Sequence, residues 1–402
     1  MLAEWEPQRM VQLTWPHKDT DWAPILPEIT AVYEEMAREI TKREPLLVVA
    51  PEGTPNLPSS ISHHPSSIIH LPTNDTWARD HGFITVEENI THHPSSLIPH
   101  PSSISPHPSS LSHQPSSLIP QPSALTHQPS PISPQPSALR LLDFKFNGWG
   151  EKFEAKLDNE INRHLYDQGM VHGNYEDHLD FVLEGGSIES DGKGTIFTTT
   201  CCLMAPHRNQ PLSQAEIEAR LKEYLGAERV VWLNHGSLIG DDTDGHIDTL
   251  ARICPNDTIV YTGGDADHPD LALMEEELKA LRTMDGKPYR LLKLPLPRPI
   301  YDPPVAEGTE ADGDSPVAEG TEADGSVVND DIVDSDRLPA TYANYLIING
   351  AVLVPTYAQP DLDAEAMRII GEAFPDREII GIDCRAVIKQ HGSLHCCTMQ
   401  YY

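Results

Sequence analysis

A seven-residue repeat with proline at its second position fills residues 93–141 and occurs again at 57–70. A heptad period usually suggests a coiled coil, but a proline in every unit removes a backbone donor and clashes with the preceding helical turn. The repeat therefore excludes helix and predicts extended, polyproline-like inserts over both ranges. The histidines from His63 to His127 are poor candidates for chemistry, because a mobile tract cannot hold a reacting group in place.

A second repeat, built on the sequence PVAEGTEADG, covers residues 304–325 with seven acidic residues and no basic one. This composition predicts a solvated acidic loop. The cost of closing a loop rises only logarithmically with its length, so one domain can carry such insertions. We therefore expect a single domain over residues 1–402, interrupted by inserts at 57–70, 93–141 and 304–325. The inserts are expected to be passive, although the first ends close to residue 75 and could gate a site there.

The remaining sequence alternates short β-branched runs with segments of helical periodicity. Strands are expected at 46–50, 195–200, 229–233, 258–263, 344–350 and 351–355. Helices are expected at 26–42, 213–226 and 270–283, with Ser213 and Asp270 as N-caps. This alternation predicts an α/β architecture with functional residues at strand ends and in the loops that follow.

Charge and composition exclude several classes of protein. The chain has 28 Lys and Arg against 61 Asp and Glu, a formal net charge of −33, so nucleic acids and anionic membrane surfaces are unfavourable partners. It contains no apolar run long enough to span a membrane, and its first residues do not form a signal peptide, so a cytoplasmic protein is expected. Six cysteines without a CxxC spacing favour free thiols over disulfides or a zinc site.

The segment DTDGHIDT places Asp244, His246 and Asp248 at alternate positions. In a strand all three side chains would point to one face. Three interpretations remain open at this point: a polar cluster on a solvated strand, a metal site, or an acid-base centre with a carboxylate beside an imidazole.

The segment GSLHCCT contains His395, Cys396 and Cys397 close to the end of the sequence. Adjacent cysteines are most simply small buried hydrophobic residues. Alternatively, one of them is a nucleophilic thiolate activated by a nearby positive charge. Two further polar segments, DTWARD at 75–80 and LEGGSIE at 183–189, are either ordinary turns or parts of a site.

These segments occur together and in order in one known family. The chain resembles the agmatine deiminases and bacterial-type peptidylarginine deiminases of the guanidino-modifying enzyme superfamily. The matching segments are EWEPQ (4–8), TWPH (14–17), DTWARD (75–80), FNGWG (146–150), LEGGSIE (183–189), DDTDGHIDT (241–249), PATYANYLIINGAVLVPTY (339–357) and GSLHCCT (392–398). They span nearly the whole chain, and the repeats fall between them.

The resemblance implies that Cys396 is the nucleophile and His246 the general acid and base. It makes Asp80 and Asp248 the carboxylates that bind the substrate. A guanidinium is planar and permanently charged, so two aspartates on different segments can match its N–H donors. Attack by the thiolate, loss of ammonia and hydrolysis of the resulting thiouronium on Cys396 would complete a deimination with no metal or organic cofactor.

The resemblance further implies that Glu184 supports His246 and that Trp77 forms a wall of the substrate pocket. Cys397 is expected to be structural, since an extended segment would point it away from Cys396. The implied fold is a pentein, an α/β propeller of five pseudo-symmetric repeats around a central site.

Agmatine is the expected substrate, giving N-carbamoylputrescine and ammonia in a route to putrescine and other polyamines. The alternatives are a peptidylarginine deiminase, a metal-dependent amidohydrolase using Asp244, His246 and Asp248, and a non-catalytic binding protein on the same fold. Free arginine is disfavoured because its carboxylate would require a cationic partner that the sequence does not identify. A homo-oligomer is possible.

Overall fold

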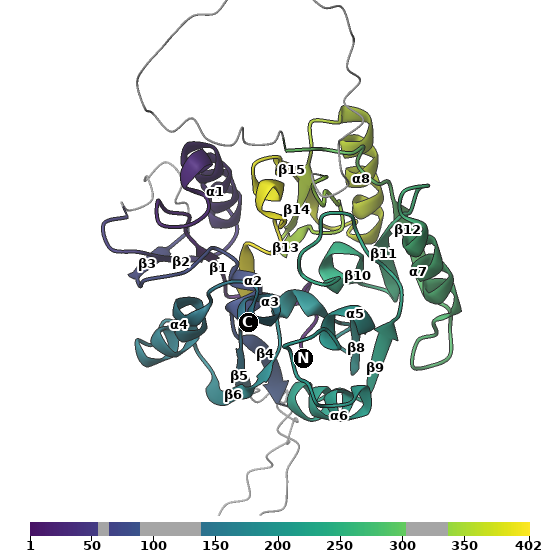
Figure 1. Cartoon of the computed structure of the whole chain (residues 1–402), viewed down its shortest axis with the longest axis horizontal. Coiled ribbons are helices and arrows are strands. Elements are labelled where there is room, and N and C mark those ends of the chain that lie inside the picture. The colour runs from purple at the N-terminus through teal and green to yellow at the C-terminus, as the bar shows by residue number, and fades with distance from the viewer. Residues whose placement is uncertain (55–63, 89–137, 303–336) are drawn as a thin grey trace, which may run out of the picture. The chain divides into compact units, whose positions relative to one another are not determined.

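The described part of the chain contains five small β-sheets and the helices that connect their strands. The computed structural model describes residues 1–54, 64–88, 138–302 and 337–402, and within it Met1–Glu87 and Leu139–Tyr402 form one compact unit. In Figure 1 the five sheets of this unit follow one another in chain order around a common centre.

Each sheet contains two parallel neighbouring strands that a helical connection joins. The first sheet has the order β16 (Thr398–Tyr401), β1 (Met10–Thr14), β2 (Leu46–Ala50) and β3 (Ser66–His70), with η1 (Ala23–Ile25) and α1 (Leu26–Thr41) between β1 and β2. The second has β4 (Ile84–Glu88), β5 (Ala138–Lys145) and β6 (Asn174–Val182), with α3 (Gly148–Glu151) and α4 (Lys156–Asp167) between β5 and β6.

The other three sheets repeat this plan. The third has β7 (Ile188–Ser190), β8 (Thr195–Thr199) and β9 (Arg229–Leu233), with α5 (Thr200–Leu203) and α6 (Gln214–Leu225). The fourth has β10 (Ala251–Cys254), β11 (Thr258–Thr262) and β12 (Arg290–Leu294), with α7 (Pro269–Ala280). The fifth has β13 (Leu346–Ile348), β14 (Ala351–Thr356) and β15 (Glu378–Asp383), with α8 (Pro360–Ala373), and η5 (Val387–Gln390) follows it.

The last strand of the chain completes the first sheet. β16 pairs antiparallel with β1, as β7 does with β8, β10 with β11 and β13 with β14. The first sheet thus acquires an antiparallel pair next to a parallel pair, the arrangement that the third, fourth and fifth sheets build from consecutive strands. Because β16 lies beside β1, the segment just ahead of β16 is held close to the first residues of the chain.

Local sequence accounts for most of these elements. Every residue of β2 is buried, as its unbroken apolar sequence predicts. Helix α6 begins with a capping box in which Ser213 and Glu216 each accept a backbone N–H from the other, confirming Ser213 as an N-cap. The prediction of Asp270 as an N-cap is wrong. The N-cap is His268 and α7 begins at Pro269, a position where proline is favoured, so Asp270 is the second helical residue.

Two of the predicted polyproline-like inserts end earlier in the structure than the sequence repeats do. Residues 57–63, 93–137 and 304–325 lie outside the described residues, but Ser66–His70 form β3 and Ala138–Lys145 form β5. Both strands begin after the last proline of their repeat unit, so every backbone N–H in them is available for pairing. The prediction of polyproline-like structure is therefore wrong for the C-terminal ends of these two inserts. No helix among the described residues is long and apolar enough to span a membrane.

Candidate active site

Five segments, one directly ahead of the first strand of each sheet, contribute to the centre. Asp80 lies in α2 (Ala78–His81) before β4, and Glu184 precedes η2 (Gly185–Ser187) and β7. His246 precedes η3 (Ile247–Thr249) and β10, Asn344 precedes β13, and Cys396 precedes β16. Contacts between α2 and η2, between η2 and η3, and between α2 and β16 bring these segments together. Residues far apart in the sequence therefore share one buried site because each sheet begins there.

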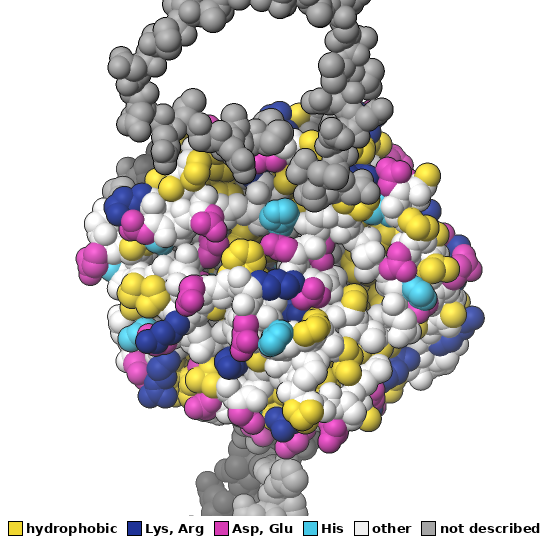
Figure 2. All heavy atoms as spheres, viewed as in Figure 1, with side chains coloured by type: hydrophobic (Ala, Val, Ile, Leu, Met, Phe, Trp, Pro, Cys, Tyr) yellow, Lys and Arg dark blue, Asp and Glu magenta, His cyan; other side chains and the backbone are white. Residues whose placement is uncertain are grey.

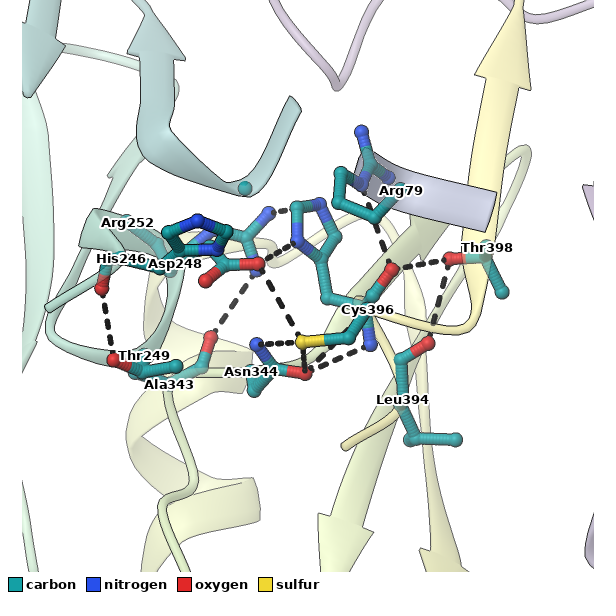
Figure 3. A network of polar contacts seen from close by, with 12 residues as sticks. Arg79, His246, Asp248, Thr249, Arg252, Ala343, Asn344, Leu394, Cys396 and Thr398 are labelled. Atoms are coloured by element: carbon teal, nitrogen blue, oxygen red, sulfur yellow. Dashed lines mark hydrogen bonds and ion pairs between the residues drawn. The ribbon is translucent and has the colours of Figure 1, made fainter. Parts of the chain in front are cut away.

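The side chain of Cys396 is buried beside the amide of Asn344, which donates to Sγ, and the carboxylate of Asp248. Its Sγ is 3.3 Å from Nδ2 of Asn344 and 3.9 Å from Oδ2 of Asp248 (Figure 3). Burial, with the negative charges of Asp248 and Asp80, raises the pKa of the Cys396 thiol well above its usual value. Burial and these carboxylates therefore favour the thiol over the thiolate at Cys396.

Asp248 is fully buried and has one oxygen engaged and one without a partner. Nδ1 of His395 lies 2.7 Å from Oδ2, whereas Oδ1 has no hydrogen-bond partner. Burial raises the pKa of Asp248, but the hydrogen bond and charge of His395 and the charge of His246 outweigh it, so the net pKa is lowered. An ionised carboxylate with a free oxygen can accept hydrogen bonds from a cationic ligand.

Asp80 is held by two donors from other segments. Trp149 donates from Nε1 to Oδ2 at 2.9 Å, and the backbone N–H of Gly186 donates to Oδ1 at 3.0 Å. Burial, with the charges of Asp248 and Glu184, raises the pKa of Asp80 against the lowering effect of His246. Both carboxylates expected to bind a guanidinium thus lie in the same site as Cys396.

His246 is the imidazole of the site. Its Nδ1 lies 3.8 Å from Oδ1 of Asp80, and neither ring nitrogen has a hydrogen-bond partner. Burial lowers the pKa of His246, but Asp80, Cys202 and Asp248 outweigh burial and raise it well above its usual value. The carboxylates around His246 therefore favour its protonated form.

The close approach of these groups depends on a glycine. A Cβ on Gly186 would lie 2.6 Å from Nδ1 of His246 and 3.0 Å from Oδ1 of Asp80. No side chain fits in that space without moving the imidazole or the carboxylate. The glycine pair after Glu184 therefore makes room for the site, in addition to forming the turn.

Glu184 differs from its expected role in one respect. Its Oε1 accepts from Nε of Arg208 at 2.9 Å, and its Oε2 has no partner, so no hydrogen bond joins it to His246. Ligand atoms of Glu184, Cys202 and His246 nevertheless lie within 4.8 Å of one another. Glu184 therefore lies beside the imidazole, but its strongest interaction is with a buried arginine that sequence reasoning missed.

Asp244, His246 and Asp248 do not lie on a strand, the geometry that would have pointed all three to one face. Asp244 has a positive φ of 66°, and Asp248 lies in the 3-10 helix η3. This turn directs Asp244 to Arg208 at 2.6 Å and Lys152 at 2.9 Å, away from the other two side chains. The alternating metal site therefore does not assemble, because one of its three proposed ligands is neutralised elsewhere.

Among the described residues, the carboxylates that could ligate a metal ion form ion pairs with arginines instead. Two groups offer three ligand atoms within 4.8 Å: Glu184, Cys202 and His246, and Glu4, Glu189 and His395. Arg208 pairs with Glu184, while Arg252 pairs with both Glu4 and Glu189. These guanidinium groups supply the positive charge that a metal ion would otherwise bring.

A cavity of about 460 Å³ leads to the nucleophile. Trp77, Trp149 and Phe153 line it, and Asp80 and Cys396 are reached from it. His246, Asp248 and Glu184 are fully buried and do not line it. Figure 2 shows acidic, basic and hydrophobic side chains interspersed over one face of the molecule, so the acidic excess forms no single patch on that face. Trp77, which the resemblance placed in a wall of the substrate pocket, is among the residues that line this cavity.

Several residues of the site were missed from sequence. Asn344 and Trp149 lie within segments that match the family, so their position beside Cys396 and Asp80 could have been suspected. Asp242, which lies in the matching segment 241–249, and Lys389, which lies in none of the matching segments, also line the cavity. Cys397, which was expected to be structural, is fully buried beside Tyr33. Burial and the neighbouring Cys397 raise the pKa of the Tyr33 phenol.

Residues 1–401 match the family described as Porphyromonas-type peptidyl-arginine deiminase. The chain belongs to this family. It is 43% identical to a candidate arginine deiminase of known structure from Porphyromonas gingivalis, with a TM-score of 0.75 and coverage of 100% of this chain and 97% of that one.

Relatives named agmatine deiminase match over the same length. The chain is 30% identical to the agmatine deiminase of C. jejuni, solved with substrate bound as a cysteine-to-serine variant, with a TM-score of 0.73 and coverage of 100% and 95%. It is 29% identical over 411 residues to agmatine deiminase of Pseudomonas aeruginosa, covering 100% of this chain and 94% of that one. The resemblance inferred from the motifs is confirmed, and with it the α/β pentein fold.

Proposed function

We propose that this protein is a hydrolase that removes ammonia from agmatine to give N-carbamoylputrescine, through a covalent thiouronium on Cys396. The observation that carries the proposal is the meeting of Cys396, His246, Asp80 and Asp248 at one end of an aromatic-lined cavity. Agmatine deiminases aligned over the full chain support the choice of substrate.

Binding of the guanidinium would neutralise the two carboxylates that keep the thiol protonated. Oδ1 of Asp248 is free to accept an N–H. Asp80, which also lies beside Gly186, is oriented by its donors Trp149 and Gly186. A bound cation offsets the charges that raise the pKa of Cys396, so the thiol releases its proton to solvent when substrate binds. The reactive thiolate then forms only in the presence of its substrate.

The first half-reaction transfers the amidine carbon to sulfur. The thiolate of Cys396 attacks the guanidinium carbon and gives a tetrahedral intermediate. His246, held as imidazolium by Asp80, donates a proton to the departing nitrogen, and the C–N bond breaks to release ammonia. A thiouronium on Cys396 and a neutral imidazole remain.

The second half-reaction restores the enzyme. Neutral His246 takes a proton from water, and the resulting hydroxide adds to the same carbon. The C–S bond then breaks and the former hydroxyl passes its proton to the departing sulfur, which releases the neutral ureido product and restores the Cys396 thiol. The two half-reactions together consume one water and release one ammonia.

The charges along the cavity favour a substrate with two positive charges. Asp21, Asp75 and Asp242 line it in addition to Asp80, against the single ammonium of Lys389. The tetramethylene chain of agmatine can pack on the aromatic walls, and its distal ammonium can interact with these carboxylates. Lys389 lies 3.8 Å from Asp302, which reduces its value as a partner for the carboxylate of free arginine.

The test is a substrate panel with matched cysteine variants. Relative kcat/KM for agmatine, arginine and blocked arginyl peptides, measured as ureido product, is expected to be highest for agmatine. Cys396→Ala should abolish turnover and Cys397→Ala should leave it nearly unchanged. Higher kcat/KM for the peptides would make the protein a peptidylarginine deiminase, and activity retained by Cys396→Ala would refute the nucleophile.

The other expectations from sequence stay predictions. These are a single domain with passive inserts, a cytoplasmic location, a possible homo-oligomer, and catalysis without a metal or organic cofactor. Activity that survives exhaustive chelation is the expected result for the last of them.

A further inference from the structure

One buried cation lies behind the reacting side chains and takes part in no step of the proposed reaction. The side chain of Arg208 is fully buried, in the loop between α5 and α6. A buried guanidinium is costly unless its donors are engaged, and here each of the three nitrogens donates. Nε donates to Oε1 of Glu184 at 2.9 Å. Nη1 donates to Oδ2 of Asp244 at 2.6 Å, and Nη2 to the backbone oxygen of Thr243 at 2.8 Å. One arginine therefore joins the segment that ends at Glu184 to the turn that leads into His246.

The backbone beside Arg208 is anchored to the strand that leads to Glu184. Oδ1 of Asn209 accepts the N–H of Val182 at 2.9 Å, and Nδ2 of Asn209 donates to the carbonyl oxygen of the same valine at 2.8 Å. Val182 is the last residue of β6, two residues before Glu184. The loop is thus fixed to the end of β6, and the guanidinium of Arg208 meets Glu184 from a fixed position.

Thr243 carries this anchorage on to His246. Its hydroxyl oxygen accepts the backbone N–H of His246 at 3.1 Å, and the hydroxyl donates to Oδ1 of Asp241 at 2.7 Å. Oδ2 of Asp241 accepts the N–H of Gly245 at 2.7 Å, which closes the turn. The backbone of His246 is therefore held at the end of a turn in which Arg208 binds both a carbonyl oxygen and a carboxylate.

The imidazole of His246 is not fixed by a hydrogen bond of its own. Among the described residues neither ring nitrogen has a partner, and Nδ1 lies 3.8 Å from Oδ1 of Asp80. Ligand atoms of Glu184 and Cys202 lie within 4.8 Å of the ring nitrogen that faces them. The position of the ring consequently depends on the backbone that carries it and on the side chains packed around it. Arg208 holds the first through Thr243 and one of the second through Glu184.

We propose that Arg208 is a positioning residue for His246, which aligns the imidazole with the nitrogen that leaves the substrate. The inference rests on the proposed deimination. Neither Arg208 nor Glu184 lines the cavity, so neither is needed to admit the substrate. Proton transfer requires a close approach of donor and acceptor, and a misplacement of about 1 Å can cost about 10²-fold in rate. Loss of Arg208 should therefore slow the chemical step and leave substrate binding nearly unchanged.

A substrate with a different leaving group separates this role from a general structural one. Ammonia leaves only after its nitrogen is protonated, whereas the methanethiolate of an S-methylisothiourea leaves as an anion. In the S-methylisothiourea analogue of agmatine, the thiolate of Cys396 attacks the same carbon and the bond from this carbon to the methylthio sulfur breaks. Methanethiolate takes a proton from water, and the same thiouronium remains on Cys396. In this half-reaction only agmatine needs a correctly placed His246.

The experiment measures ammonia release from agmatine and methanethiol release from the analogue in a single turnover with excess enzyme. Arg208→Gln is expected to slow ammonia release about 10²-fold, with methanethiol release and the KM for agmatine nearly unchanged. Lys152→Gln is the matched control, because Lys152 donates to the same Oδ2 of Asp244 and to the backbone oxygen of Asp242. The side chain of Lys152 is 37% exposed, so water can replace it, and both rates should equal those of the wild type.

Three results would contradict the proposal. An equal loss of both products in folded Arg208→Gln would show that Arg208 is merely structural, and wild-type rates for both products would show that it has no effect on His246. The selective loss of ammonia release in Lys152→Gln would overturn the assignment to Arg208, because the exposed side of the turn would then be sufficient to control the imidazole.

A second variant covers the case in which Arg208→Gln does not fold. Thr243→Val removes the hydroxyl that accepts the N–H of His246 and removes no charge. It should also slow ammonia release more than methanethiol release, and a wild-type ratio of the two rates would overturn the link from Arg208 to His246. Wild-type protein inactive on every guanidino compound would overturn the proposed function and this inference together. An active wild type whose Arg208→Gln variant keeps its rate of ammonia release would overturn the inference alone.

Discussion

Replacing Asp248 by asparagine should make Cys396 more reactive while it removes turnover. Asp248 carries the negative charge nearest the nucleophile, with Oδ2 3.9 Å from Sγ. This charge raises the pKa of the thiol, second only to burial. Asparagine has nearly the same shape and no charge, so the thiolate becomes easier to form, but the guanidinium loses one of its two carboxylates.

The magnitude follows from the distance. Two unit charges 3.9 Å apart repel by about 4 kcal/mol at an effective dielectric constant of about 20. Removing this repulsion increases the thiolate population by a factor of about 10³. A less basic thiolate is also a weaker nucleophile, with a Brønsted slope of about 0.4 to 0.5, so the alkylation rate should rise only about 30- to 60-fold.

The assay is alkylation by iodoacetamide at about pH 8, followed by peptide mass spectrometry to quantify Cys396 separately from the other cysteines. Asp244→Asn is the matched control, because Asp244 belongs to the same segment but pairs with Arg208 and Lys152. We expect Asp248→Asn to be alkylated faster than the wild type and to have no measurable deiminase activity, and we expect Asp244→Asn to react at the wild-type rate.

An unchanged or slower alkylation rate in a folded Asp248→Asn protein would refute the electrostatic reasoning. Equal acceleration in Asp244→Asn would show that the loss of any nearby acid, and not the 3.9 Å contact, controls the thiol. Thermal unfolding of both variants checks that the comparison is made on native protein.

Three further predictions test other parts of the site and the fold. Gly186→Ala should lower kcat/KM about 10²-fold in a protein that still folds, since its Cβ would displace His246 and Asp80. Trp149→Phe removes the donor to Asp80 and should raise KM for agmatine roughly tenfold or more in steady-state assays. Burial raises the pKa of Glu44 to about 7 from 4.5, so the folded state resists its ionisation and loses stability between those values. Denaturant titrations should therefore show Glu44→Gln gaining about 3 kcal/mol relative to the wild type between about pH 4 and about pH 8.

Elements with a strong local signal were predictable from sequence. β2 has the bounds expected from its apolar run, and α6 begins after its predicted cap because Ser213 and Glu216 interact within one turn. β3 and β5 were missed because the regular spacing of the prolines was the strongest pattern in those stretches of sequence. Neither strand contains a proline, and their backbones pair with β2 and β6. Such pairing depends on a partner strand distant in sequence, which no local pattern reports.

The sequence by itself determined the family and the residue types of the site, because the motifs retain Asp80, Glu184, His246, Asp248 and Cys396 in order. Their geometry is non-local and only the tertiary structure decided it. The turn at Asp244 separates that carboxylate from its neighbours, and the closure of β16 on β1 brings the nucleophile to the N-terminal segment.

The electrostatics also depend on the tertiary structure. Whether Cys396 is a thiol or a thiolate depends on carboxylates more than a hundred residues away along the chain. Charges interact through space and burial strengthens the interaction, so the linear order of residues cannot give their protonation states.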